Sequence, residues 1–136
     1  MHLLKRHWVT VFFAVIAIVS LFIIACDSNN ASNENSCTVT YTANTMSVYQ
    51  NVPGIGTYEV YGVYNSSYGG IDNSYKETYT LASDAESQCD EIIDDDWYSN
   101  VEWMGNLITY EDFNEVSIQE QVADYQEMCD FFLESY

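Results

Sequence analysis

The sequence predicts an α+β domain, a small antiparallel sheet of three to five strands with two helices packed on one face. Several segments in the first half of residues 37–136 carry apolar side chains at every second position, which is typical of half-buried strands. Two segments in the second half carry them three and four positions apart, which is typical of helices. An antiparallel sheet with both helices on one face would bury these apolar side chains together.

Three strands are predicted before the first helix. Residues 37–42 alternate strictly between larger side chains and threonines. A break at residues 51–56, which contains a proline and two glycines, precedes a second strand over residues 57–64, rich in tyrosine and valine. A loop over residues 65–73 leads to a third strand over residues 75–81. Each strand would turn one face toward the core.

Both predicted helices open with a capping box, a serine followed three residues later by a glutamate. The two pairs are Ser83 with Glu86 and Ser117 with Glu120. Apolar residues at helical spacing follow each box and place Cys89 on the inward face of the first helix and Cys129 on that of the second.

A hairpin is predicted between the two helices. Residues 101–104 and 107–110 would pair across the Gly105–Asn106 dipeptide, which supplies the backbone angles of a tight turn. The alternative is a first helix that continues from Ile93 through Trp103.

The first 25 residues have the organisation of an export signal. Lys5 and Arg6 begin it, residues 8–24 are apolar and uncharged, and an alanine then precedes Cys26. The ending Ile-Ile-Ala-Cys resembles the lipobox of bacterial lipoproteins. That resemblance implies that Cys26 is the lipidated first residue of a membrane-anchored mature chain in the cell envelope, facing the periplasm or the exterior.

Two other interpretations of this segment remain. It could be an ordinary secretory signal, or its apolar run of about 17 residues could stay as a membrane-spanning helix, for which roughly 20 residues are usual. The domain organisation expected from the lipoprotein resemblance is a signal peptide over residues 1–25, the lipidated cysteine and a polar tether over 26–36, and one α+β domain over 37–136.

The charge of the chain divides at Cys26. All 21 acidic residues follow it, where Lys76 is the only basic residue, so one base against 21 acids gives the mature chain a net charge of −20. Both histidines and the only arginine precede it. The mature chain therefore has no side chains for histidine-based catalysis or common zinc sites, and almost none to neutralise nucleic-acid phosphates. The acidity indicates either cationic partners or adaptation to a salty habitat.

Three cysteines remain after Cys26, and outside the cytoplasm thiols tend to pair. Cys37, Cys89 and Cys129 all lie on predicted apolar faces. Because all three lie on such faces, the sequence alone does not choose among the pairings. A disulfide between Cys37 and Cys89, which would join the first strand to the first helix, is favoured slightly over one between Cys89 and Cys129.

Two groups of residues are candidates for binding. One is the acidic run Asp90, Glu91, Asp94, Asp95 and Asp96, whose carboxylates suit a hard cation such as calcium, although the spacing is not that of an EF-hand. The other is a set of tyrosines that cannot all face one core and are suited to surface recognition. These are Tyr58, Tyr61, Tyr64 and Tyr68.

The sequence therefore favours a lipid-anchored, non-catalytic envelope protein with an acidic, tyrosine-rich surface for a protein partner. No catalytic residues and no obligatory cofactor are expected. The alternatives are an inhibitor of a basic exported enzyme such as a lysozyme, and a calcium-dependent structural protein of the cell surface.

Overall fold

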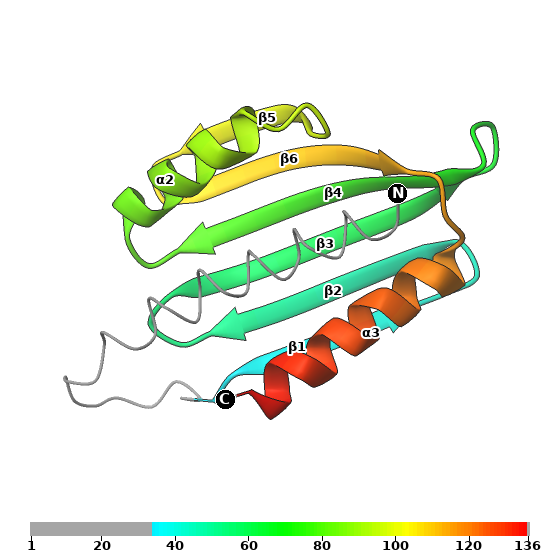
Figure 1. Ribbon diagram of the computed structural model, residues 1–136, viewed down its shortest axis with the longest axis horizontal. Helices are drawn as coiled ribbons and strands as arrows, with labels where there is room; N and C mark the ends of the chain where they lie inside the picture. Colours follow the sequence, from blue (N-terminus) through cyan, green and yellow to red (C-terminus); the bar gives the residue numbers. More distant parts are fainter. Residues whose placement is uncertain (1–33, 136) are drawn as a thin grey trace. The chain divides into compact units, whose positions relative to one another are not determined.

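The structure is a computed structural model that describes residues 34–135. Eight elements follow one another in these residues (Figure 1). They are β1 (Ser36–Tyr41), β2 (Thr45–Val52), β3 (Gly56–Asn65), β4 (Gly70–Tyr79), α2 (Ala82–Ile93), β5 (Ser99–Met104), β6 (Leu107–Asn114) and α3 (Ile118–Glu134). The predicted signal segment, Cys26 and most of the predicted tether lie outside the described residues.

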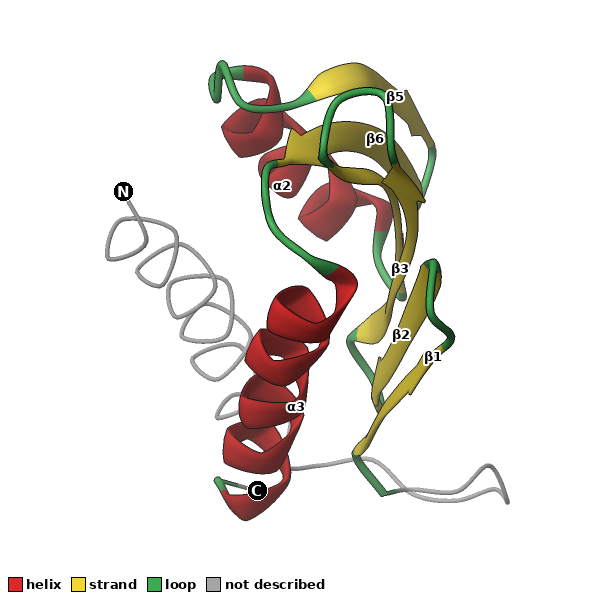
Figure 2. Ribbon diagram, turned by 90° about the vertical axis from the view of Figure 1, so that its right-hand side faces the viewer, coloured by secondary structure: helices red, strands yellow, loops and turns green. Residues whose placement is uncertain are grey.

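All six strands form one antiparallel sheet in the order β1-β2-β3-β4-β6-β5. Both helices lie on the same side of this sheet (Figure 2). Helix α3 packs against β1 and β2, and α2 packs against β4, β5 and β6. The α+β class is confirmed, but the sheet has six strands rather than three to five.

Strand β2 is the strand that the sequence pattern did not predict. Its inward positions are Met46, Val48, Gln50 and Val52, and all four are buried. The glutamine interrupts the apolar alternation, so the segment lacked the uninterrupted pattern of a half-buried strand. Strand β4 also begins earlier than predicted, at Gly70, because the turn after β3 takes only residues 66–69.

The predicted serine cap of the second helix is confirmed and that of the first is wrong. The Ser117 side chain accepts a hydrogen bond from the backbone N–H of Glu120 at 3.2 Å, as predicted. Helix α2 instead starts after Leu81, with no side-chain cap. The backbone N–H of Thr80 still donates to the carbonyl of Ile55, so the chain leaves the sheet at Leu81 and the helix begins before Ser83 can cap it.

The predicted hairpin is confirmed, and no helix runs on through Trp103. Strands β5 and β6 pair from Met104 opposite Leu107, with a two-residue turn between them. Gly105 has a φ of 65° in this turn. A side chain at that angle would be strained, which explains why a glycine stands there.

The disulfide joins Cys37 of β1 to Cys129 of α3, with their Cα atoms 5.3 Å apart. The expected Cys37–Cys89 pairing is therefore wrong, and so is the alternative of Cys89 with Cys129. Helix α3 covers the β1 edge of the sheet, whereas α2 carries Cys89 over the opposite edge. Cys89 is a buried free cysteine, and burial raises the pKa of its thiol.

The core lies between the sheet and the helices. Its largest fully buried apolar side chains are Phe132, Met46, Ile71, Ile108 and Ile118. Two glutamines are buried in this core, and they differ in their hydrogen bonding. Gln121 of α3 donates a hydrogen bond to the Asn73 side chain at 2.7 Å and accepts one from Asn114 at 3.1 Å. Gln50 is 1% exposed, and neither its amide oxygen nor its amide nitrogen has a hydrogen-bond partner.

We expect Gln50→Met to raise the free energy of unfolding by about 1 to 3 kcal/mol, because it replaces an unpaired buried amide with an apolar side chain of similar length. Urea unfolding followed by circular dichroism measures the change. Gln121→Met is the matched control, and it should lower the stability because it removes a hydrogen-bond partner of both Asn73 and Asn114. A loss of stability in Gln50→Met would contradict the prediction.

Candidate functional site

The face of the sheet opposite the helices is the candidate functional site. No helix among residues 34–135 covers it (Figure 2). Two rows of directly opposed side chains run across the middle of this open face. The first row is Tyr49, Glu59, Lys76, Thr109 and Glu102, on β2, β3, β4, β6 and β5. The second row is Ser47, Tyr61, Ser74 and Glu111, on β2, β3, β4 and β6.

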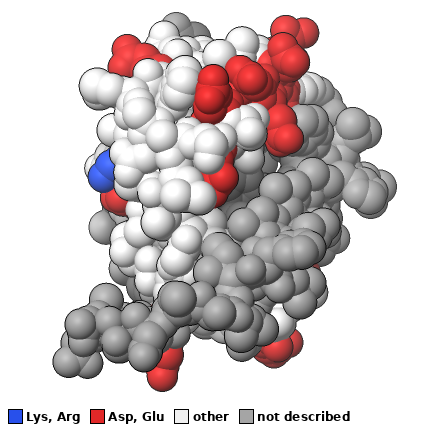
Figure 3. All heavy atoms as spheres, turned by 90° about the vertical axis from the view of Figure 1, so that its left-hand side faces the viewer, with Lys and Arg blue, Asp and Glu red and all other residues white. Residues whose placement is uncertain are grey.

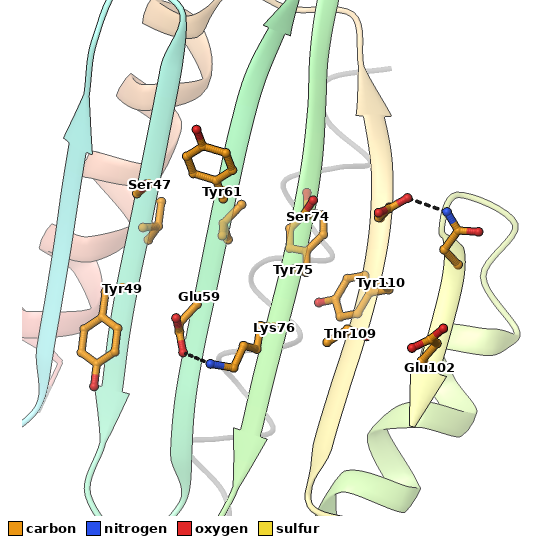
Figure 4. Close-up of a pocket in the computed structure, with 14 residues that line it drawn as sticks. Ser47, Tyr49, Glu59, Tyr61, Ser74, Tyr75, Lys76, Glu102, Thr109 and Tyr110 are labelled. Atoms are coloured by element: carbon orange, nitrogen blue, oxygen red, sulfur yellow. Dashed lines mark hydrogen bonds and ion pairs between the residues drawn. The ribbon is translucent and has the colours of Figure 1, made fainter. Parts of the chain in front are cut away.

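These two rows line a shallow groove with a volume of about 720 Å³ (Figure 4). Asn100, from the start of β5, adds an amide to its rim. The groove crosses five of the six strands, from β2 to β5. A hollow of this kind is wide and open, which suits an extended ligand better than a small molecule that must be enclosed.

Two tyrosines form the aromatic end of the groove. Tyr49 is 45% exposed and Tyr61 is 50% exposed. Tyr49 lies opposite Glu59, and Tyr61 is two positions further along β3, so the two rings are diagonal neighbours on adjacent strands. Each ring presents apolar area together with a hydroxyl group, which is typical of side chains that anchor a binding partner.

Three glutamates and one lysine set the charge of the groove. The ammonium group of Lys76 lies 3.0 Å from the carboxylate of Glu59, so these two charges offset each other (Figure 4). The carboxylate of Glu111 accepts a hydrogen bond of 2.5 Å from the neutral side-chain amide of Asn100. Glu102 adds a third carboxylate. The groove therefore has a net charge of −2.

The backbone of β5 is irregular where it supplies Asn100. The register shifts between Ser99 and Glu102, and Asn100 has a φ of 52°. Asparagine tolerates this left-handed conformation better than most residues with a side chain. The irregularity turns the amide of Asn100 toward Glu111, where it orients that carboxylate.

A second polar cluster lies on the helix side of the sheet, around Glu77. This side chain is 1% exposed, and its two carboxylate oxygens accept hydrogen bonds of 2.5 Å from the hydroxyls of Tyr79 and Tyr110. Burial raises the pKa of Glu77 above its usual range, although the two hydrogen bonds oppose the shift. Burial also raises the pKa of Tyr110, and the nearby Glu77 carboxylate raises it further.

Further polar side chains extend this buried cluster toward α3. The carboxylate of Asp112 accepts hydrogen bonds from the Tyr75 hydroxyl at 3.1 Å and from the Asn73 amide at 2.8 Å. The ring of Tyr75 stacks on that of Tyr110 with centroids 4.7 Å apart. Burial raises the pKa of Tyr125, on α3, to about 12, so its hydroxyl stays protonated at neutral pH. The contacts of Asp112 and Tyr75 join β4 to β6, and the hydrogen bond between Tyr125 and Tyr75 joins α3 to these strands.

The four tyrosines predicted for surface recognition are divided between the two sides of the sheet. Tyr61 lies on the open face, whereas Tyr58 and Tyr64 lie in the cross-strand rows of the helix side. Tyr68, in the turn between β3 and β4, is 76% exposed, and its ring meets the edge of Phe113. Tyr49 was missed because the strand that carries it was not predicted.

The acidic run from Asp90 to Asp96 lies at the end of α2 and in the residues that follow it. Acidic side chains gather on the part of the surface that carries α2 (Figure 3). Within the described residues, no three acidic, cysteine or histidine side chains converge as metal ligands would. The predicted calcium site at Asp90, Glu91, Asp94, Asp95 and Asp96 stays a prediction.

Comparison of the chain with protein-family models, with curated proteins and with solved structures finds no match. Residues 34–135 contain no helix that is both long enough and apolar enough to cross a membrane. No relative therefore indicates a function for the chain.

Proposed function

We propose that the chain is a lipid-anchored, non-catalytic protein of the cell envelope whose domain recognises another protein through the open face of its sheet. The observation that carries this proposal is the groove of the open face, in which Tyr49 and Tyr61 are exposed at one side and the carboxylates of Glu102 and Glu111 lie at the other. Aromatic side chains that become buried in a protein interface commonly supply much of its binding energy.

The anchor in this proposal is Cys26, which lies outside the described residues. It rests on the lipobox ending of residues 23–26 and on the polar composition of the residues that follow. A tether of this kind would leave the domain free to meet partners at the membrane surface.

The charge of the mature chain favours a basic partner. A net charge of −20 attracts cationic proteins over long range and repels acidic ones, and the groove itself has the same sign. A basic exported enzyme such as a lysozyme would be one partner of this kind.

The proposal is tested by capturing the full-length chain from the membrane fraction of its native cells and identifying the proteins that it retains. We expect wild type to retain a specific protein and Tyr49→Ala/Tyr61→Ala to retain at least about tenfold less of it. Truncating an aromatic anchor that is buried in an interface commonly costs about 2 kcal/mol, or about 30-fold in affinity. Retention by wild type should fall as salt rises. Mass spectrometry of the mature N-terminus should find a lipidated Cys26, and an unmodified Cys26 would overturn the anchor.

Tyr41→Ala/Tyr68→Ala is the matched control, because both of these tyrosines are exposed and neither lines the groove. The control should retain the same protein as wild type. Equal retention by Tyr49→Ala/Tyr61→Ala and wild type would contradict the role of the open face.

A further inference from the structure

The open face is polarised along both of its rows. The first row begins with Tyr49 on β2 and ends with Glu102 on β5. In the second row Tyr61 lies on β3 and Glu111 on β6. Aromatic area therefore gathers at the β2–β3 side of the groove, and carboxylates at its β5–β6 side.

Among residues 34–135, no cation neutralises the two carboxylates of the β5–β6 side. Lys76 is the only lysine or arginine among residues 34–135, and its ammonium group lies on Glu59. Glu111 has a neutral amide as its partner. Glu102 lies opposite Thr109, two positions from Glu111 along β6, so the two glutamates are diagonal neighbours on adjacent strands. Two neighbouring carboxylates of this kind favour a guanidinium or ammonium group between them.

The spacing of the strands indicates how long a ligand must be. Neighbouring strands lie about 4.8 Å apart, so the four steps from β2 to β5 separate Tyr49 from Glu102 by about 19 Å. An extended chain advances about 3.3 Å per residue and therefore covers this distance in about six residues. A short extended segment that lies across the strands would reach both sides of the groove.

We propose that the groove binds an extended segment of a partner protein, with an arginine or lysine at Glu102 and Glu111 and an apolar or aromatic side chain about six residues away on Tyr49 and Tyr61. This inference rests on the proposed function and specifies which part of the partner is bound. A second copy of the chain does not suit the groove, because its described residues contain a single basic side chain, which is already paired.

A displayed library of random eight-residue peptides tests this inference, with the full-length chain in detergent as the bait. We expect wild type to enrich peptides with an arginine or lysine at one end by about fivefold over the unselected library, the factor expected of one favourable exposed ion pair. Apolar or aromatic residues should be enriched about six positions away. The variant Glu102→Gln/Glu111→Gln should lose the basic preference and keep the apolar one.

The matched control is Glu86→Gln/Asp130→Asn, which changes the net charge equally on exposed positions of α2 and α3. It should retain the basic preference. Loss of that preference in the control, or its absence in wild type, would overturn the inference, because long-range attraction or no attraction would then explain the result. Partner capture that depends on Tyr49 and Tyr61 without any basic preference would overturn this inference alone and leave the proposed function standing.

Discussion

Removal of the Cys37–Cys129 disulfide is expected to lower the free energy of unfolding by about 4 to 5 kcal/mol. The two cysteines are 92 positions apart, and cross-linking a loop of that length removes much of the entropy of the unfolded chain. A loss of this size is comparable with the whole stability of many domains of about 100 residues. Urea unfolding of Cys37→Ala/Cys129→Ala beside wild type measures the loss.

Cys89→Ala is the control for this experiment, because Cys89 is buried but forms no disulfide. We expect it to lose about 1 kcal/mol, the contribution of a small buried group. A reductant should lower the stability of wild type and leave that of the double variant unchanged. If the control lost as much as the double variant, packing rather than the cross-link would explain the result.

The second large effect is expected from Glu77, whose pKa burial raises in the folded state. Between the ordinary pKa of a glutamate and the raised one, the folded chain binds more protons than the unfolded chain. The free energy of unfolding contributed by Glu77 is therefore greatest at low pH, and it falls as pH rises through this window, by up to about 1.4 kcal/mol per pH unit. Above the folded pKa the contribution of Glu77 no longer changes.

Glu77→Gln should remove this part of the pH dependence, because an amide does not titrate. Urea unfolding of both proteins across pH 4 to 8 gives the difference in slope. Glu86→Gln removes one negative charge from an exposed position of α2 and corrects for the general repulsion between carboxylates. Identical slopes for wild type and Glu77→Gln would show that Glu77 titrates in the folded state as it does in the unfolded state.

Local patterns predicted those elements whose side chains alternate or repeat without interruption. The hairpin of β5 and β6 and the cap at Ser117 depend on a few adjacent residues, and both are confirmed. Strand β2 escaped prediction because Gln50 occupies an inward position that the alternation assigns to an apolar side chain. The cap at Ser83 was wrong because Thr80 stays bonded to Ile55, a contact between distant parts of the chain.

The candidate site was predicted only in part for the same reason. A surplus of tyrosines over the capacity of one core indicated exposed aromatic side chains, and Tyr61 is one of them. The pairing of β2 with β3 brings Tyr49 next to it, and the pairing of β4 with β6 brings Glu111 across from Ser74. Neither neighbour relation follows from distances along the sequence.

The sequence by itself determined the α+β class, the acidity and the number of cysteines, because composition and short-range periodicity are properties of the chain alone. The tertiary structure decided which cysteines meet and which side chains share the open face. Cys37 meets Cys129 because α3 lies over β1. The order of the strands places β6 between β4 and β5, so side chains of these three strands are neighbours on the open face. Both results depend on how segments far apart in the sequence pack together. Local patterns are compatible with several arrangements of the strands and helices, and burial of a common core selects one of them.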